Sequence, residues 1–181
     1  RTPFNPRYSS HMKSDYTEGN AFQWSFFAPH DMDNFIAAIG GKKELETRLD
    51  TLFTTSSQID GAEASGDITG LIGQYAHGNE PSHHMAYLYN WTDAPWKGQE
   101  RLDFIMRNFY TNQPDGIIGN EDCGQMSAWY VMSAMGFYQV CPGIPVYTVG
   151  RPMVDKATIR VAGGTFEIVV TNNSPENKYV K

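Results

Sequence analysis

Apolar and polar positions along this chain follow the spacing of amphipathic helices through much of its length. The segment NFIAAI follows aspartates that can cap a helix, and Gly40 and Gly41 stop it. In the next segment, 42–53, leucines recur at positions i, i+4 and i+7 and form one apolar face. We therefore predict two helices joined by a tight glycine turn.

Three further helices are predicted before residue 145. Two of them, 80–91 and 95–110, open with a proline near the first helical position, where the missing N–H does no harm. The third, 123–138, is apolar on nearly all sides, so we expect it to be buried. The glycine-rich stretch before residue 80 is mostly loop, although 67–76 is compatible with a short helix.

The pattern changes to short β-branched runs after residue 145. Segments 146–150, 156–161 and 165–170 predict strands, with Gly163 and Gly164 in a hairpin turn. With about six helices in pairs, the chain is expected to be mainly α with a small β part. Residues 1–144 would then form part of an (α/α)6 toroid, and residues 145–181 would begin a β-strand module.

Composition narrows the class of protein. The chain has 181 residues, of which 40% are hydrophobic, so it can bury a core. A net charge of -6 without any basic run excludes nucleic acid and anionic membranes as partners. No apolar run reaches the ~18–20 residues of a membrane-spanning helix. The two cysteines set no disulfide framework and are expected to be free thiols in a core.

Three loops place a carboxylate beside glycine or asparagine and just before aromatic residues. They carry Glu18 in YTEGNAFQW, Glu80 in HGNEPSHH, and Glu121 with Asp122 in GNEDCGQMSAW. Any one of these carboxylates could simply cap a helix. Together they favour glycoside hydrolysis, which needs one protonated and one ionised carboxyl group facing a sugar. Aromatic residues, 13% of the chain, also suit sugar binding.

The histidines of HGNEPSHH raise the question of a metal site. The segment lacks the HExxH zinc motif, and Glu80-x-x-His83, half of a di-iron motif, has no second copy in the chain. His83 and His84 are adjacent, so on a helix they point about 100° apart and do not both face one ion. The amide of Asn79 and the carboxylate of Glu80 instead match a hard cation such as Ca²⁺.

Three blocks of the sequence resemble the signature segments of glycoside hydrolase family 92: YTEGNAFQWSFFAPHD, GQYAHGNEPSHHMAYLYNW with PWKGQE, and PDGIIGNEDCGQMSAWYVMSAMGFYQVCPG. This resemblance implies a calcium-dependent exo-α-mannosidase, many of which are described as α-1,2-mannosidases. It implies a C-terminal fragment of a longer parent chain, in which an N-terminal β-sandwich precedes the toroid. It also implies secretion to the periplasm or surface of a bacterium.

By this resemblance, Glu18 is the general acid and Asp122 the general base of an inverting hydrolysis, with Glu121 as a rival for the base. Asn79 and Glu80 would hold Ca²⁺, which would coordinate the 2- and 3-hydroxyls of the terminal mannose of a glycan. Four residues are expected to contact the substrate: His77 on the leaving-sugar side, Trp24, Gln23 and Asn120. The remaining helices and the β-sandwich of the parent chain are the expected partners.

Two departures from the family pattern leave details open. Asn120 stands where an acidic residue often precedes the base by two positions, and Gly78 stands where we expect glutamate in the α-1,2-selective branch. Two other functions also stay open. One is an inactive carbohydrate-binding or structural fragment of a larger glycosidase; the other is a toroid lyase or a different glycosidase that needs no calcium.

Overall fold

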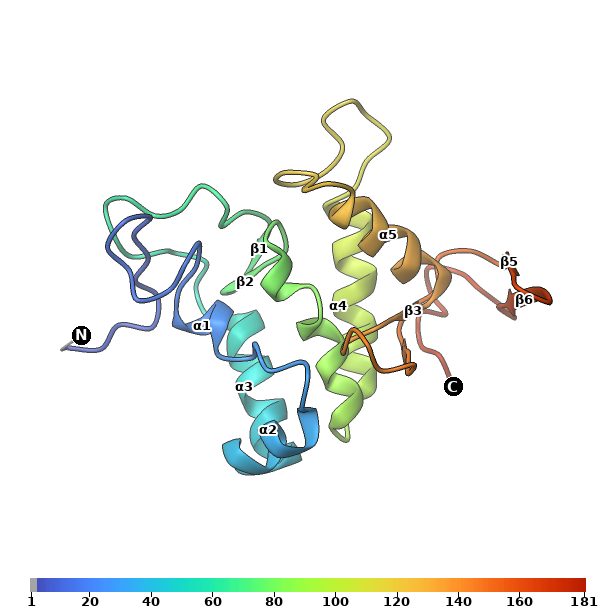
Figure 1. Cartoon of the computed structure of the whole chain (residues 1–181), viewed down its shortest axis with the longest axis horizontal. Helices are drawn as coiled ribbons and strands as arrows, with labels where there is room; N and C mark the ends of the chain where they lie inside the picture. The colour runs from blue at the N-terminus through green and yellow to red at the C-terminus, as the bar shows by residue number, and fades with distance from the viewer. Residues whose placement is uncertain (1–2) are drawn as a thin grey trace.

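The structure is a computed structural model that describes residues 3–181, in which five α-helices and two 3-10 helices precede a β-hairpin (Figure 1). The helices are α1 (Ala21–Trp24), α2 (Met32–Ile39), α3 (Lys42–Thr54), η1 (Glu80–Ser82), η2 (Met85–Trp91), α4 (Pro95–Asn108) and α5 (Gln125–Met135). The strands form antiparallel pairs: β1 (Leu71–Ile72) with β2 (Tyr75–Ala76), β3 (Phe137–Tyr138) with β4 (Thr148–Val149), and β5 (Lys156–Val161) with β6 (Gly164–Val169).

Helices α2, α3 and α4 lie where the periodicity predicts them. The side chain of Asp31 caps α2 by accepting a hydrogen bond from the N–H of Asn34, and Gly40 ends it with a φ of 108°. All three leucines of the predicted apolar face of α3 are completely buried. The glycine turn between the two helices therefore exists as the sequence predicts.

One hydrophobic core joins the helices. Its fully buried members include Leu49 of α3, Leu88 of η2, Leu102 and Ile105 of α4, and Trp129 of α5. Burying an aliphatic side chain of this size contributes roughly 1.5–3 kcal/mol. The core unites segments far apart in the sequence, so the loops between the helices are carried on a common frame.

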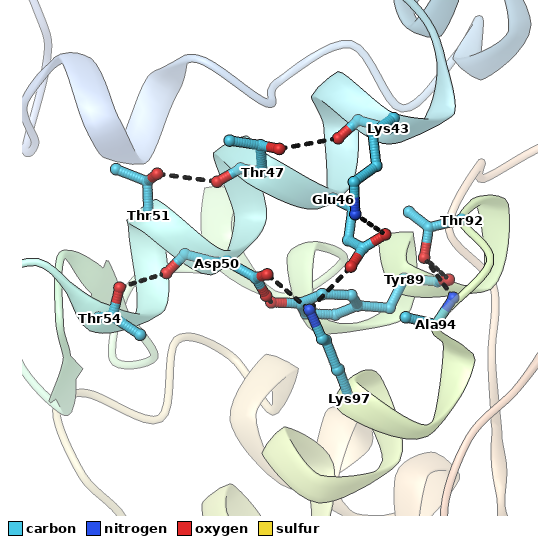
Figure 2. Close-up of polar contacts among 10 residues, drawn as sticks. All are labelled: Lys43, Glu46, Thr47, Asp50, Thr51, Thr54, Tyr89, Thr92, Ala94 and Lys97. Atoms are coloured by element: carbon cyan, nitrogen blue, oxygen red, sulfur yellow. Dashed lines mark hydrogen bonds and ion pairs between the residues drawn. The ribbon is translucent and has the colours of Figure 1, made fainter.

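A polar cluster beside this core connects α3, η2 and α4, as Figure 2 shows. The Nζ atom of Lys97 lies 2.9 Å from Oε1 of Glu46 and 2.6 Å from Oδ2 of Asp50. The hydroxyl of Tyr89 donates to the other oxygen of Asp50 at 2.9 Å. Because the charged side chains are partly exposed, each ion pair is worth less than about 1 kcal/mol, but their geometry sets how α4 lies against α3.

Two segments fold differently from the helices that their patterns allowed. Residues 67–76 contain the β1–β2 hairpin, because Gly70 and Gly73 adopt positive φ angles of 62° and 60°, which a right-handed helix does not accommodate. Residues 80–91 form η1 and η2 with a turn at the adjacent histidines between them. The prediction of one continuous helix is wrong there, because buried polar side chains bond to neighbouring segments and override the local preference.

The apolar segment 123–138 also departs from its prediction. Its helix, α5, ends at Met135 because Gly136 adopts the left-handed conformation with a φ of 97°. Phe137 and Tyr138 leave the helix and pair with β4. The helix is not buried on all sides either, since Val131 is 53% exposed. The two free cysteines, expected in a core, are not buried: Cys123 is exposed and Cys141 is partly exposed.

The β5–β6 hairpin lies where the sequence predicts it, but its turn is shifted by one residue. Gly164 pairs with Val161, so the turn consists of Ala162 and Gly163, and the φ of Gly163 is 89°. The fold is a mixture of helices and small antiparallel sheets, in partial agreement with the expected class. The α-helices of residues 3–181 do not close a ring, and β3 pairs with β4 across residue 144. The toroid and the boundary at residue 144 therefore stay predictions.

A buried arginine attaches the C-terminal segment to α4. Arg151 is 2% exposed, and its Nε lies 3.1 Å from Oδ1 of Asp103. Its two terminal nitrogens donate to the side chain of Asn173 at 2.8 Å and to the backbone carbonyl of Ser174 at 3.0 Å. These contacts fix the strand-rich end of the chain against the helical core.

Replacing Arg151 should therefore cost more stability than replacing a surface arginine on the same carboxylate. Arg151→Met leaves Asp103 without its buried partner, and we expect a loss of about 3 kcal/mol in the free energy of unfolding of the full-length protein. Arg107 also lies 3.0 Å from Asp103 but is 39% exposed, so Arg107→Met should cost less than about 1 kcal/mol. Denaturant titration measures the free energy of unfolding of both variants. Equal losses would contradict the role of Arg151 in attaching the C-terminal segment to α4.

Candidate active site

The loop that carries Glu18 is fixed by the short helix that follows it. Glu18 is exposed and has a φ of 52°, a left-handed conformation that is uncommon outside glycine. The indole N–H of Trp24 donates to the carbonyl of Thr17 at 2.8 Å. A Cβ on Gly19 would lie 2.8 Å from the same indole nitrogen, so a larger side chain at this position would displace the indole. The carboxyl group of Glu18 is thus presented to solvent on a constrained backbone.

Buried amide side chains hold α1 beneath this loop. The side chain of Asn20 accepts from the backbone N–H groups of Phe22 and Gln23, and Gln23 accepts from the N–H of Asn20 at 2.7 Å. The amide nitrogen of Gln23 donates to the carbonyl of Gln74 at 2.9 Å. Gln23, expected to contact the substrate, is 3% exposed and uses both ends of its amide within the protein. The structure shows Gln23 shaping the loop of Glu18.

In the loop before α5, the neighbouring carboxyl groups of Glu121 and Asp122 have different surroundings. Glu121 accepts from the backbone N–H of Ser127 at 3.0 Å and from its hydroxyl at 2.8 Å, so both oxygens of Glu121 cap the start of α5. Asp122 is exposed and has a φ of 52°. The carboxyl group of Glu80 lies close to that of Asp122 and interacts with it. Of the two candidates for the base, Asp122 is the one that the helix cap does not use.

Glu80 and Asp122 lie together although 41 positions separate them in the sequence. Desolvation, followed by the hydrogen bond to Glu80 and its negative charge, raises the pKa of Asp122 above the ordinary value for aspartate. Asp67 and Glu121 add further negative charge around it. A cation would relieve the repulsion between such carboxylates, and this is the donor chemistry of a hard metal ion.

Asn79 brings the loop of Glu18 to the same place. Its Nδ2 atom donates to the backbone carbonyl of Glu18 at 3.0 Å, which leaves Oδ1 as an acceptor. Asn79 and Glu80 therefore offer oxygen atoms suited to Ca²⁺. Within residues 3–181, no group of three or more His, Cys, Asp or Glu side chains is arranged to hold a metal ion. These two residues would thus supply only part of a coordination shell.

His77 lies in the core and not on an exposed surface. Its Nδ1 accepts from the hydroxyl of Tyr75 at 2.8 Å, and its Nε2 donates to the hydroxyl of Tyr110 at 2.7 Å, because Tyr110 in turn donates to the carbonyl of Met126. Burial raises the pKa of both tyrosines, so the phenols stay protonated. Neither ring nitrogen of His77 is free in the structure, and the expected contact between His77 and a leaving sugar stays a prediction.

The adjacent histidines His83 and His84 are buried as well. Nε2 of His83 donates to the carbonyl of His77 at 3.0 Å, and Nε2 of His84 donates to the carbonyl of Phe26 at 2.8 Å. Burial lowers the pKa of both, and that of His83 falls to about 4. Both rings are therefore neutral near pH 7, with one donor and one acceptor each.

The last two expected substrate contacts lie at the surface. Asn120 is exposed in the loop before Asp122, and Trp24 is half-buried. Trp24, Tyr16 and Phe22 line a cavity of ≈ 550 Å³ between the loop of Glu18 and α3. A larger cavity of ≈ 1110 Å³ lies beside the β5–β6 hairpin, and none of the expected site residues lines it.

Sequence reasoning missed the backbone conformation of the two expected catalytic residues. Four non-glycine residues of the described chain have positive φ: Glu18, Asp122, Cys123 and Asn172. Such conformations cluster at functional sites, because only a structure that determines them strongly tolerates their cost. Neither the sequence spacing nor the residue types signalled this strain. Gly19 next to Glu18 and Asn120 two positions before Asp122 were the only local hints of an unusual turn.

Comparisons with known proteins agree on one family. The sequence model of the glycosyl hydrolase family 92 catalytic domain matches residues 1–181. A family 92 α-mannosidase from Bacteroides thetaiotaomicron, solved in complex with mannoimidazole, is 44% identical and superposes with a TM-score of 0.90 over 100% of this chain. An inverting family 92 mannosidase from the same bacterium is 34% identical, with a TM-score of 0.79 over 99% of this chain.

A curated relative from the fungus Arthroderma benhamiae is described as an uncharacterized secreted glycosidase. It is 27% identical over 168 residues, which make up 91% of this chain and 20% of that protein. The chain likewise spans 24% and 25% of the two bacterial mannosidases. It therefore corresponds to about a quarter or less of each of these relatives.

Buried neutral histidines predict how stability depends on pH. His77, His83 and His84 have lowered pKa values in the folded chain because they are buried, whereas in the unfolded chain they take up protons near pH 6.5. The unfolded state therefore binds more protons as pH falls from about 6.5 to about 4, and the free energy of unfolding should fall over that window. Denaturant titrations between pH 7 and 4 measure it.

A matched pair of variants distinguishes the contribution of buried histidines to this pH dependence from the contribution of carboxylates. His84→Gln keeps a donor for the carbonyl of Phe26 but does not titrate, so the slope between pH 6.5 and 4 should become shallower. His11→Gln changes an exposed histidine and should leave the slope unaltered. A wild-type protein that keeps its stability down to pH 4, or equal slopes for all three proteins, would contradict the prediction.

Proposed function

The chain belongs to glycosyl hydrolase family 92, and from this premise we propose that it carries the acid, the base and a cation site of an inverting exo-α-mannosidase acting on glycans. One observation carries the proposal: the loop of Asn79 and Glu80 contacts both expected catalytic loops. Asn79 bonds to the backbone of Glu18, and Glu80 lies close enough to Asp122 to raise the pKa of its carboxyl group. This loop therefore gathers the groups that glycoside hydrolysis needs.

In this proposal Glu18 protonates the glycosidic oxygen as the leaving sugar departs. Asp122 removes a proton from a water molecule that attacks the opposite face of the ring. Such enzymes leave ~6.5–9.5 Å between the two carboxyl groups to admit the water. A base works well when its pKa approaches the working pH, and the raised pKa of Asp122 goes in that direction.

The proposed cofactor is Ca²⁺, held in part by Oδ1 of Asn79 and the carboxylate of Glu80. When bound, it would offset the negative charge shared by Glu80 and Asp122 and coordinate vicinal hydroxyls of the sugar. Asn79 would also keep the loop of Glu18 in place through its Nδ2 atom. Trp24 and Asn120, which are accessible beside the two carboxylates, remain the proposed sugar contacts.

The surroundings of Gly78 leave little room for the glutamate expected there in the α-1,2-selective branch. A Cβ at this position would be 1.8 Å from Oγ1 of Thr69, and a Cβ on Gly119 would be 2.8 Å from the same atom. A larger side chain at position 78 therefore requires Thr69 to move. We propose α-1,2-linked mannose as the substrate on the strength of the family. Selectivity for that linkage must then come from residues other than position 78.

The proposed partner of this chain is the rest of its parent protein. Apolar side chains on its surface, among them Val161, Phe166 and Val169, are 51%, 54% and 68% exposed, and all three line the cavity beside the β5–β6 hairpin. Apolar surface gathered in this way is usually covered in a folded protein. Secretion is proposed because the fungal relative is described as secreted. No helix among residues 3–181 combines the length and apolar character that crossing a bilayer requires.

Metal removal gives a first test. If Asn79 and Glu80 hold Ca²⁺, excess chelator should abolish hydrolysis of an aryl α-mannoside by the full-length protein. Added Ca²⁺ should restore the rate better than Zn²⁺, because the ligands are oxygen atoms. Full activity in excess chelator would contradict the cation site while leaving the two carboxylates to be tested separately.

The role of Glu18 can be separated from that of Asp122 by changing the leaving group. Glu18→Gln cannot deliver a proton, so cleavage of a mannobiose should fall by about 10³-fold, and cleavage of 4-nitrophenyl α-mannoside by much less. Asp122→Asn loses the base, which both substrates need equally. Equal losses for Glu18→Gln on both substrates would show that Glu18 only positions the sugar. Unchanged rates in both variants would favour a binding or structural fragment instead.

A further inference from the structure

The adjacent histidines between η1 and η2 are not explained by the proposed chemistry. His83 and His84 are 1% and 5% exposed, and neither is among the residues proposed to touch sugar or metal. Their side chains nevertheless form hydrogen bonds in two directions, toward the two different segments that carry the expected acid and base.

His84 bonds to the segment of the acid. Its Nε2 donates to the carbonyl of Phe26, and its ring packs edge-on against Phe27 with the centroids 6.0 Å apart. Residues 17–26, which we call the acid unit, include Glu18 and are braced internally by the Asn20 cap and by the bond from Trp24 to Thr17. Moving the ring of His84 would therefore move the acid unit as one body.

His83 bonds to the segment of the base. Its Nδ1 accepts from the side-chain amide of Gln125 at 3.1 Å, and its backbone carbonyl accepts from the indole of Trp129 at 2.9 Å. Residues 121–129, which we call the base unit, include Asp122 and the Glu121 cap of α5. The other ring nitrogen of His83 donates to the carbonyl of His77, just before the loop of Asn79 and Glu80.

We propose that His83 and His84 are positioning residues that set the placement of the acid unit relative to the base unit. Because one peptide bond joins them, their two rings hold the units at a distance that the backbone cannot vary much. Displacement of a catalytic group by 1 Å can lower a rate by about 100-fold, so a short rigid connection of this kind has a direct effect on turnover. The inference rests on the proposed function.

Each histidine then acts on a different step of the reaction. Disturbing His84 displaces Glu18, so the loss should be larger for a poor leaving group than for an activated one. Disturbing His83 displaces Asp122, so the loss should be the same for both. A merely structural role would lower both rates together in either variant and would not produce this difference.

The experiment uses the full-length protein with Ca²⁺, 4-nitrophenyl α-mannoside, and whichever α-linked mannobiose the wild type cleaves. His84→Leu removes the donor for Phe26, and His84→Gln keeps a donor near the position of Nε2. His83→Gln likewise keeps the donor for the carbonyl of His77 but loses the acceptor for Gln125. His83→Asn keeps that acceptor, near the position of Nδ1, and loses the donor. His11→Gln is the exposed control.

We expect His84→Leu to lower kcat by about 100-fold on the mannobiose and by about tenfold on the aryl substrate, with His84→Gln close to wild type. His83→Gln should lower kcat by about tenfold on both substrates. Adding Gln125→Leu to His83→Gln should cause no further loss, because the same bond is already broken. Adding Gln125→Leu to His83→Asn should lower kcat further, because His83→Asn keeps the acceptor for Gln125.

Three results would overturn the inference in an active wild-type protein. They are wild-type kcat in His84→Leu, the same loss on both substrates in His84→Leu, and full additivity of His83→Gln with Gln125→Leu. Should His84→Leu fail to fold, the two His83 variants decide, because each keeps one polar bond of the ring. An inactive wild type with Ca²⁺ would instead contradict the proposed function.

Discussion

The arrangement of the whole site depends on how the eight residues 77–84 are held. This segment lies in the interior of the chain, where an unpaired polar group costs about 1–3 kcal/mol. Its polar side chains are therefore bonded to other segments, and each bond fixes a piece of the surroundings. The partners are Tyr75 and Tyr110 for His77, the backbone of Glu18 for Asn79, Gln125 for His83 and the backbone of Phe26 for His84.

The need to pair these buried polar groups also explains why two residues with exposed carboxyl groups can adopt an unfavourable backbone conformation. A non-glycine residue with positive φ costs of order 1–3 kcal/mol, and both Glu18 and Asp122 have φ angles of 52°. The flanking backbone is bonded in each case: Asn79 bonds to the carbonyl of Glu18, and the N–H of Gln125 donates to the carbonyl of Asp122. Hydrogen bonds from buried groups thus maintain the strain that presents the carboxylates.

The sequence predicted those parts of the fold that depend on local periodicity. Helices α2, α3 and α4 follow from apolar spacing and end signals that act within a few residues. The 3-10 helices at 80–91 and the buried positions of Gln23 and His77 depend on partners 33 or more positions away, such as Gln74 and Tyr110. The family resemblance implied sugar contacts for Gln23 and His77, and residue type could not decide the matter, because amides and imidazoles serve equally well in binding sites and in buried networks. Glu121 and Asp122 could be told apart only once the cap on Ser127 was visible.

The most direct test of the central claim is a crystal structure of the full-length protein with Ca²⁺ and a mannose-like inhibitor. If residues 77–84 hold the acid and base units for inversion, the carboxyl groups of Glu18 and Asp122 should be ~6.5–9.5 Å apart on opposite faces of the sugar ring. The bonds from Asn79 to Glu18, from His83 to Gln125 and from His84 to Phe26 should all be present. Carboxyl groups ~5 Å apart, as in retaining enzymes, or a site assembled without these bonds, would contradict the account.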